Sequence, residues 1–252
     1  MTATLTRAWH EPAATRDGLA QLAPFAAELW THRLLLDRRR AARHQTAEMA
    51  AITAAMESRA HALGAEALVL TGSTARGARS AVSDLDYHVI GARPSIEGLP
   101  AEIDLYCDEP ADLLAKLTRG DDFAHWTLRH GCVFFDSGVL REAAVYTAER
   151  DFWPDPERKL RQARQTLDFA ERLLASGDHA AALEQVRGAL SLAARWWLLA
   201  HDVFPLARAE LPVQLRALNQ PALAHALQAT IHERPGMKDL GTSVATARAH
   251  TG

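Results

Sequence analysis

Cysteine is scarce in this 252-residue sequence, which contains only Cys107 and Cys132. Two cysteines are too few for a disulfide framework, and these form neither a CxxC pair nor a metal-ligand spacing. Long apolar runs are also missing, because Arg187 and Arg195 interrupt the most apolar stretch. Acidic residues flank the mildly apolar segment 18–27, which argues against a secretory signal. We therefore expect a cytoplasmic protein without a membrane-spanning helix.

An excess of positive charge is absent too, since 28 basic residues stand against 31 acidic ones, for a net charge of −3. A dedicated nucleic-acid-binding protein carries a broad positive field, so nucleic acid is expected here only as an acceptor at a local patch. With 48% hydrophobic and 23% charged residues, the composition is that of a globular protein and excludes general disorder.

The first part of the chain mixes helical patterns with short apolar runs. The sequence predicts one or two helices within 24–63 and a helix from Pro110 to Leu117. Short apolar or alternating runs predict four strands, at 67–70, 84–90, 102–107 and 132–135. We therefore expect residues 1–150 to form a small mixed sheet flanked by helices, with a helical extension before the first strand.

Beyond the two prolines in Trp153-Pro154-Asp155-Pro156 the pattern becomes helical only. Apolar residues at helical spacing predict four helices, at 157–175, 179–201, 208–218 and 221–232. Residues 151–235 are therefore predicted to form a helical bundle and residues 236–252 a loose tail. The predicted fold class is α/β (α+β), a mixed sheet with helices followed by an all-α domain.

Three aspartates lie on two neighbouring predicted strands. Asp84 and Asp86 are two residues apart, so their carboxylates project from one face, and Asp104 on the next strand can lie alongside. Two such charges about 4 Å apart repel by about 4 kcal/mol at an effective dielectric constant of about 20, which a divalent cation would relieve. Oxygen ligands select Mg²⁺ or Mn²⁺, and a nucleoside triphosphate would complete the coordination.

A glycine turn, Gly72-Ser73-Thr74-Ala75-Arg76-Gly77, directly follows the first predicted strand. Gly72 allows close backbone approach, and the amides of Ser73 and Thr74, with the Ser73 hydroxyl, are suited to bind phosphate oxygens at a helix N-terminus. Arg76 either contacts phosphate or caps the short helix by an ion pair. The turn and the aspartates together predict a site for a nucleotide and a metal ion.

Three segments resemble the signature of the polymerase-β-type nucleotidyltransferase superfamily, namely Gly72 to Gly77, Ser83-Asp84-Leu85-Asp86 and Ile103-Asp104-Leu105. That signature is a Gly-Ser turn, an Asp-x-Asp pair about ten residues later and a third acid flanked by apolar residues on a following strand. The details look most like the minimal and the antibiotic (aminoglycoside) nucleotidyltransferases. The helical C-terminal half is also similar to the bundle of the antibiotic enzymes.

This resemblance implies that Asp84 and Asp86 hold two metal ions and that Asp104 completes the second metal site and helps to deprotonate the acceptor hydroxyl. The hydroxyl would attack the α-phosphate, and pyrophosphate would leave. The resemblance also implies a homodimer. The residues expected to bind the nucleotide are Gly72, Ser73, Thr74, Arg76 and Ser83.

The charge of segment 97–122 bears on the acceptor. It holds eight acidic and two basic residues, a net charge of −6. This charge either suits a cationic acceptor such as an aminoglycoside or belongs to solvated acids on helices and loops. We therefore expect an enzyme that transfers AMP from ATP to a hydroxyl of a small molecule, which would confer antibiotic resistance. An antitoxin-like enzyme that modifies a protein or tRNA is the alternative with the same chemistry.

A third hypothesis comes from the R-x5-H spacing of Arg195 and His201, which is found in HEPN ribonucleases. In that case the bundle would bind or cut RNA and the first domain would only sense a nucleotide. Trp196 and Trp197 are expected in the core or at a domain interface. Arg129 and His130, before the fourth apolar run, either reach the site or have an ordinary surface role, and the surface role is the one expected.

Overall fold

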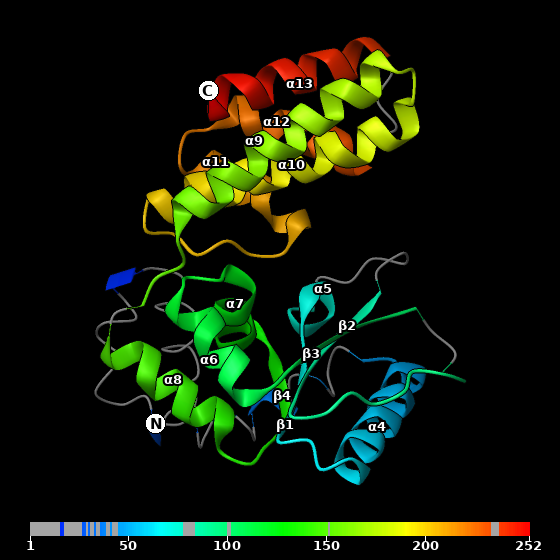
Figure 1. Ribbon diagram of the computed structural model, residues 1–252, viewed down its shortest axis with the longest axis vertical. Helices are drawn as coiled ribbons and strands as arrows, with labels where there is room; N and C mark the ends of the chain where they lie inside the picture. The colour runs from blue at the N-terminus through cyan, green and yellow to red at the C-terminus, as the bar shows by residue number, and fades with distance from the viewer. Residues whose placement is uncertain are drawn as a thin grey trace. The chain divides into compact units, whose positions relative to one another are not determined.

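The computed structural model describes residues 16–17, 27–28, 30, 33, 36–38, 41, 45–77, 84–99, 102–150, 152–232 and 237–252. Ser83 and most of the expected N-terminal helical extension lie outside these residues. The chain divides into two compact units, Met1–Pro154 and Asp155–Gly252, which Figure 1 draws with the N-terminal unit in blue to green. The sequence places this division a few residues earlier, at 150.

The first unit contains a mixed four-stranded sheet in the order β3-β2-β1-β4. β1 runs antiparallel to both of its neighbours, whereas β2 and β3 are parallel. The fold class expected from the sequence is thereby confirmed, and all four strands fall where their apolar patterns predict them. Their bounds are Ala67–Leu70 for β1, Leu85–Ile90 for β2, Ile103–Asp108 for β3 and Cys132–Asp136 for β4.

Helix α4 (Ala47–Ala62) covers one face of the sheet. The side chain of Thr46 caps its N-terminus by accepting a hydrogen bond from the Met49 amide. Ile52 and Met56 lie on its buried stripe, and Thr53 Oγ1 is hydrogen bonded to the Tyr87 hydroxyl of β2 at 2.8 Å. This contact satisfies two buried polar groups and fixes the helix against β2.

Three helices cover the other face of the sheet, as Figure 1 shows: α6 (Pro110–Thr118), α7 (Asp122–His130) and α8 (Val139–Glu149). The sequence predicts α6 but neither α7 nor α8. Apolar residues of these helices and of the strands pack into a core over the sheet. This core includes Ala67, Val69, Ile90, Leu113, Leu117, Ala124, Leu128, Val133, Leu140, Ala143 and Ala144.

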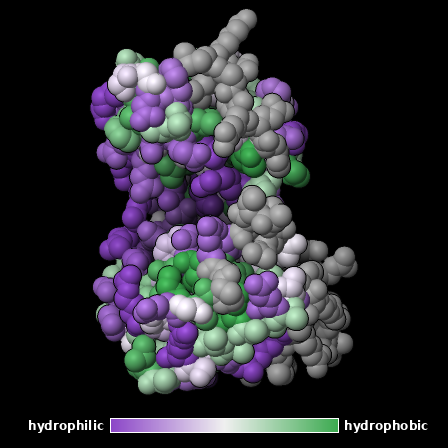
Figure 2. All heavy atoms as spheres, turned by 90° about the vertical axis from the view of Figure 1, so that its right-hand side faces the viewer, coloured by the Kyte–Doolittle hydropathy of each residue, from purple (hydrophilic) through white to green (hydrophobic). Residues whose placement is uncertain are grey.

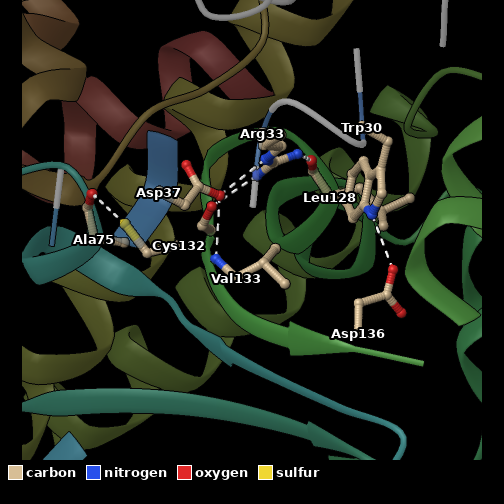
Figure 3. A network of polar contacts seen from close by, with 9 residues as sticks. Trp30, Arg33, Asp37, Ala75, Leu128, Cys132, Val133 and Asp136 are labelled. Atoms are coloured by element: carbon tan, nitrogen blue, oxygen red, sulfur yellow. Dashed lines mark hydrogen bonds and ion pairs between the residues drawn. The ribbon is translucent and has the colours of Figure 1, made fainter. Parts of the chain in front are cut away.

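Charged side chains from the N-terminal segment bind the outer edge of β4 (Figure 3). Asp37 accepts a hydrogen bond from the Val133 amide at 3.1 Å, as Figure 3 shows. Arg38 donates to the Phe134 carbonyl at 2.9 Å. Arg33 pairs with Asp37 at 3.1 Å and is almost completely buried. Such side chains satisfy backbone groups that an exposed edge strand would offer to another chain. The N-terminal segment thus completes the edge of the sheet.

The second unit is a bundle in which α9 (Pro156–Ala175) and α10 (His179–Ala200) are the long pair. A 3₁₀ turn at Arg208–Glu210 leads into α11 (Leu211–Ala217), which α12 (Pro221–His232) follows. The sequence predicts a tail at 236–252, and that prediction is wrong, because α13 (Met237–Thr251) packs against α9, α10 and α12. Ala247 of α13 is fully buried there, and Arg248 pairs with Asp168 of α9 at 2.7 Å.

Within the described residues, no helix is both long enough and apolar enough to cross a membrane. On the face drawn in Figure 2, hydrophilic side chains predominate on the second unit, whereas the first unit gathers hydrophobic side chains into one patch.

Candidate functional site

Asp86 and Asp104 are direct partners in the parallel pairing of β2 with β3. Paired residues on neighbouring strands point to the same face of a sheet, so the two carboxylates lie side by side. Asp84 immediately precedes β2 and lies two residues before Asp86. Asp104 is exposed, while Asp84 and Asp86 are half-buried. The structure therefore places Asp86 and Asp104 side by side, with Asp84 close to them along the chain.

The first turn of helix α5 (Gly72–Ala75) lies directly against Asp86. Gly72 has a φ of +65°, and a Cβ atom built on it would lie 1.9 Å from Oδ2 of Asp86. Only glycine fits this position, because the positive φ disfavours side chains and the carboxylate fills the space that one would need. The glycine turn and the acids thus share one site.

Hydrogen bonds hold α5 in register with β2. The Asp86 carbonyl accepts from the Thr71 amide at 2.7 Å and from the Thr71 hydroxyl at 3.2 Å. Thr74 Oγ1 donates to the Asp84 carbonyl at 3.4 Å. Thr74 therefore orients the backbone that carries the acids, a role different from the phosphate contact that the sequence suggests for its amide.

The C-terminal end of α5 is anchored to β4 and α7. Cys132 Sγ donates to the Ala75 carbonyl at 3.4 Å, a contact drawn in Figure 3. Arg76 Nη1 lies 3.4 Å from Nδ1 of His130. The surface role expected for Arg129 and His130 is wrong, because both are buried, and Arg129 lies over the Trp153 ring at 4.9 Å.

The three acids influence one another electrostatically. The pKa of Asp86 is raised from 3.8 to about 6, first because burial disfavours the charged carboxylate and then because Asp104 and Asp84 repel it. Burial, with the charges of Asp104 and Asp86, also raises the pKa of Tyr106. A site in which like charges raise a carboxyl pKa is poised to bind a cation.

The donor chemistry of the site fits a hard divalent cation. Asp86 and Asp104 supply oxygen ligands, and a magnesium site commonly takes one or two carboxylates from the protein and the rest from water and phosphate. Among the described residues, no three His, Cys, Asp or Glu side chains converge closely enough to hold a metal ion by themselves. Asp84 as a further ligand stays a prediction, and so do the two ions.

Sequence reasoning missed a buried polar network beside the acids, on the same face of the sheet. His88, two residues after Asp86, is completely buried, with Nε2 at 3.0 Å from Asp108 Oδ2 and Nδ1 at 3.0 Å from Thr127 Oγ1. Lys116 forms an ion pair with the other oxygen of Asp108. The hydrogen bond from His88 and the pairing with Lys116 lower the pKa of Asp108 to about 2.

Two aromatic rings lie over this network. Phe123 of α7 contacts the His88 ring, with centroids 5.2 Å apart, and the Tyr106 ring of β3 at 4.7 Å. Tyr106 is paired in register with His88, so it shares the face of Asp104 two residues before it. The alternation of Asp104, Tyr106 and Asp108 along the strand was the sequence signal for a common face.

Arg195 and His201 of the proposed ribonuclease motif have different partners. Arg195 donates to the Leu206 carbonyl at 3.4 Å, whereas His201 is hydrogen bonded to the Trp197 carbonyl at 2.8 Å and stacks on the Trp197 ring. Trp196 and Trp197 are half-buried, and Trp197 packs against the core of the bundle. These contacts give both motif residues a structural role at the end of α10.

The comparisons with known proteins give a distant structural similarity and no family. No family model matches the sequence, and no curated protein matches it either. Among solved structures, the chain is similar to the crystal structure of a nucleotidyltransferase-like protein from Exiguobacterium sibiricum 255-15, at 16% identity and a TM-score of 0.40. The match covers 82% of this chain and 74% of that one. The function of this chain must therefore be inferred from the geometry of its site.

Proposed function

We propose that this chain is a metal-dependent nucleotidyltransferase that transfers AMP from ATP to a hydroxyl of a small cationic acceptor, such as an aminoglycoside, with release of pyrophosphate. The observation that carries the proposal is the contact of Gly72 with Asp86 while Asp86 pairs with Asp104. A turn with free amides beside two carboxylates is what a magnesium triphosphate requires.

The turn would bind the triphosphate tail. The first amides of a helix have no partner within the helix, so those of Ser73 and Thr74 can donate to phosphate oxygens. Arg76 follows at the end of α5, and its contact with His130 leaves it beside the turn. Ser83 is proposed to contribute as well, although it lies outside the described residues. These donors would orient the leaving pyrophosphate.

Asp86 and Asp104, with Asp84, would hold Mg²⁺. When bound, the ion would neutralise charge on the triphosphate and make the acceptor hydroxyl more acidic. Asp104 is the exposed acid of the three, so it is the one proposed to accept the proton from the hydroxyl. Asp86 is proposed to stay in its half-buried place against Gly72, where its carboxylate would face the triphosphate.

Only some of the acids in segment 97–122 can attract a cationic acceptor. Asp108 is paired with Lys116 and hydrogen bonded to His88, and Asp121 caps α7 by accepting from the Phe123 and Ala124 amides. These acids therefore contribute little to an outward field. Five acids of the segment remain exposed: Glu97, Glu102, Asp104, Glu109 and Asp112. Their charge would attract a cation toward β3 and α6.

The test uses ATP labelled at the α-phosphate, Mg²⁺ and three acceptor pools: aminoglycosides, cell protein and tRNA. Label on an aminoglycoside supports the proposal, whereas label only on protein or tRNA would assign the site to the alternative acceptors. Absence both of transfer and of ATP binding would contradict nucleotidyl transfer itself.

Variants distinguish the site from a contaminating activity. Asp86→Asn and Asp104→Asn are expected to lower the transfer rate by about 100-fold or more, because each removes an ionic ligand from the reacting centre. Glu149→Gln removes an exposed carboxylate outside the acidic segment and should leave the rate within about twofold, since exposed charges contribute little. Equal rates for all three variants would contradict the assignment.

A further inference from the structure

Among the described residues of the first unit, Tyr106 is one of a few large apolar side chains that are exposed, with 43% of its surface accessible. It stands two residues beyond Asp104 on the same face of β3, about 7 Å along the strand. Its ring is tilted by 46° against the half-buried ring of Phe123. The two rings therefore form an aromatic surface next to the exposed acid of the proposed site.

Hydrogen-bonded groups beneath Phe123 fix the position of this aromatic surface. Phe123 rests on His88, which is fixed at both ring nitrogens by Thr127 and Asp108. The Asp121 side chain caps the helix just before Phe123 and sets the start of α7. A surface whose supporting groups are already ordered loses little freedom when a ligand binds, which favours a recognition role.

The position of Tyr106 across the sheet indicates which part of a substrate it meets. The glycine turn follows β1, Asp86 lies on the adjacent β2, and Asp104 and Tyr106 lie on β3 beyond it. Neighbouring strands are about 4.8 Å apart, so Asp86 lies between the turn and the strand that carries Asp104 and Tyr106. In an in-line displacement the attacking hydroxyl lies opposite the leaving pyrophosphate, which is the side of Tyr106.

We propose that Tyr106 and Phe123 form the acceptor subsite, which binds one flat face of a cationic ring such as an aminosugar. The proposal rests on the nucleotidyl transfer proposed above. An ammonium group near an aromatic face is attracted by the ring, and Asp104 on the same strand and Glu102 just before it add charge attraction. A neutral nucleobase would stack on the ring but would gain nothing from these carboxylates.

The experiment measures KM for kanamycin and KM for ATP separately, in wild type, Tyr106→Ala and Tyr106→Phe. Tyr106→Ala is expected to raise KM for kanamycin about 10-fold and to leave KM for ATP unchanged, because an aromatic–cation contact has about that value. Tyr106→Phe keeps the ring and should stay within about twofold of wild type. A rise in KM for ATP alone would place the nucleobase on Tyr106 and overturn the proposal.

Direct binding of kanamycin without nucleotide, followed by calorimetry, separates this proposal from the proposed function. Binding that Tyr106→Ala weakens about 10-fold supports the subsite even when wild type transfers no AMP. If Tyr106→Ala transfers AMP to kanamycin as well as wild type does, the subsite is overturned while nucleotidyl transfer stands. The subsite is also overturned if wild type does not bind kanamycin. Leu63→Ala removes another exposed apolar side chain of this unit and should change neither value.

Discussion

Gly72 lies so close to Asp86 that a methyl group on its Cα would approach the carboxylate oxygen to 1.9 Å. The contact joins the turn after β1 to the second residue of β2, which lie 14 positions apart in the chain. A position that tolerates no side chain next to a half-buried acid couples the backbone of the turn to the orientation of that acid. This coupling leads to the first prediction.

Gly72→Ala is expected to lower nucleotidyl transfer by about 100-fold or more, because the new methyl group must displace the Asp86 carboxylate or the turn itself. The matched control is Gly98→Ala. Gly98 has a similar φ of +73° but nothing within 4 Å of an added Cβ. Both variants should lose about 1 kcal/mol of stability from backbone strain, and only Gly72→Ala should lose activity. Equal activity losses would contradict the prediction.

Asp86→Asn is expected to stabilise the metal-free protein at pH 8. The pKa of Asp86 is raised from 3.8 to about 6 in the folded state, so the stability that the protonated carboxyl contributes at low pH is lost as pH rises through 6. Asparagine avoids this loss, which amounts to about 1–2 kcal/mol after allowance for partial exposure. Urea unfolding in EDTA should show the gain at pH 8 and little difference at pH 4.

Divalent cations should stabilise the wild type more strongly at pH 8 than at pH 5. Binding requires ionised Asp86, and its pKa of about 6 means that a proton competes with the cation below that pH. Thermal unfolding with and without Mg²⁺ or Mn²⁺ measures the effect. Asp86→Asn and Asp104→Asn should abolish it, whereas Asp112→Asn should preserve it. A cation-induced shift that is the same at both pH values would speak against these ligands.

Asp108→Asn is expected to destabilise the first unit by about 2 kcal/mol near neutral pH, because the ionised carboxylate is bound by His88 and Lys116. The pKa of Asp108 is lowered from 3.8 to about 2 in the folded state. The stabilisation is therefore fully present above pH 3.8 and is lost as pH falls through 2. Denaturant unfolding of both proteins across this range should show the difference shrinking toward pH 2.

The buried pair of Arg33 and Asp37 should matter most when only one partner is removed. Asp37→Ala leaves Arg33 buried without its ion pair and frees the Val133 amide, which should cost about 3–5 kcal/mol. The double variant Arg33→Met, Asp37→Leu should lose less, because no buried charge remains. A double variant less stable than Asp37→Ala would show that Arg33 stabilises the fold even without Asp37, through its hydrogen bonds to the Leu128 and Gly131 carbonyls.

The sequence predicts the strands and the long helices well where a clear period is present. Alternation around Asp104 and the apolar run at β1 each matched one strand, and the spacing of leucine and alanine matched α9 and α10. Such periods arise from burial of one face, which the chain encodes locally. The division into a sheet unit and a helical unit is visible for the same reason.

The missed helices lack such a signal. Helix α7 contains His125, Trp126 and Thr127, which form helices poorly, and it persists because Asp121 caps it and its side chains are buried. Burial lowers the pKa of His125 to about 3, which keeps this core histidine neutral. Helix α13 includes Gly241 and three threonines and is held by packing and by Arg248. Tertiary contacts outweigh propensity in both helices.

In the candidate site, too, some residues could be identified from the sequence and others only from the structure. The choice of Asp84, Asp86 and Asp104 and of the Gly72 turn follows from residue types and spacing alone. The Tyr106 surface, the His88 network and the buried Arg129 and His130 depend on α7, whose place over the sheet no local pattern reveals.

By itself, the amino-acid sequence determined which segments are extended, which are helical and which carry acids on alternate positions, because these properties depend on neighbours a few residues away. Tertiary structure alone decided that β2 pairs with β3 in the register that sets Asp86 beside Asp104, and that Gly72 closes on Asp86. A period of two assigns a side chain to a face, but only the packed sheet and its covering helices select its partner across the strands.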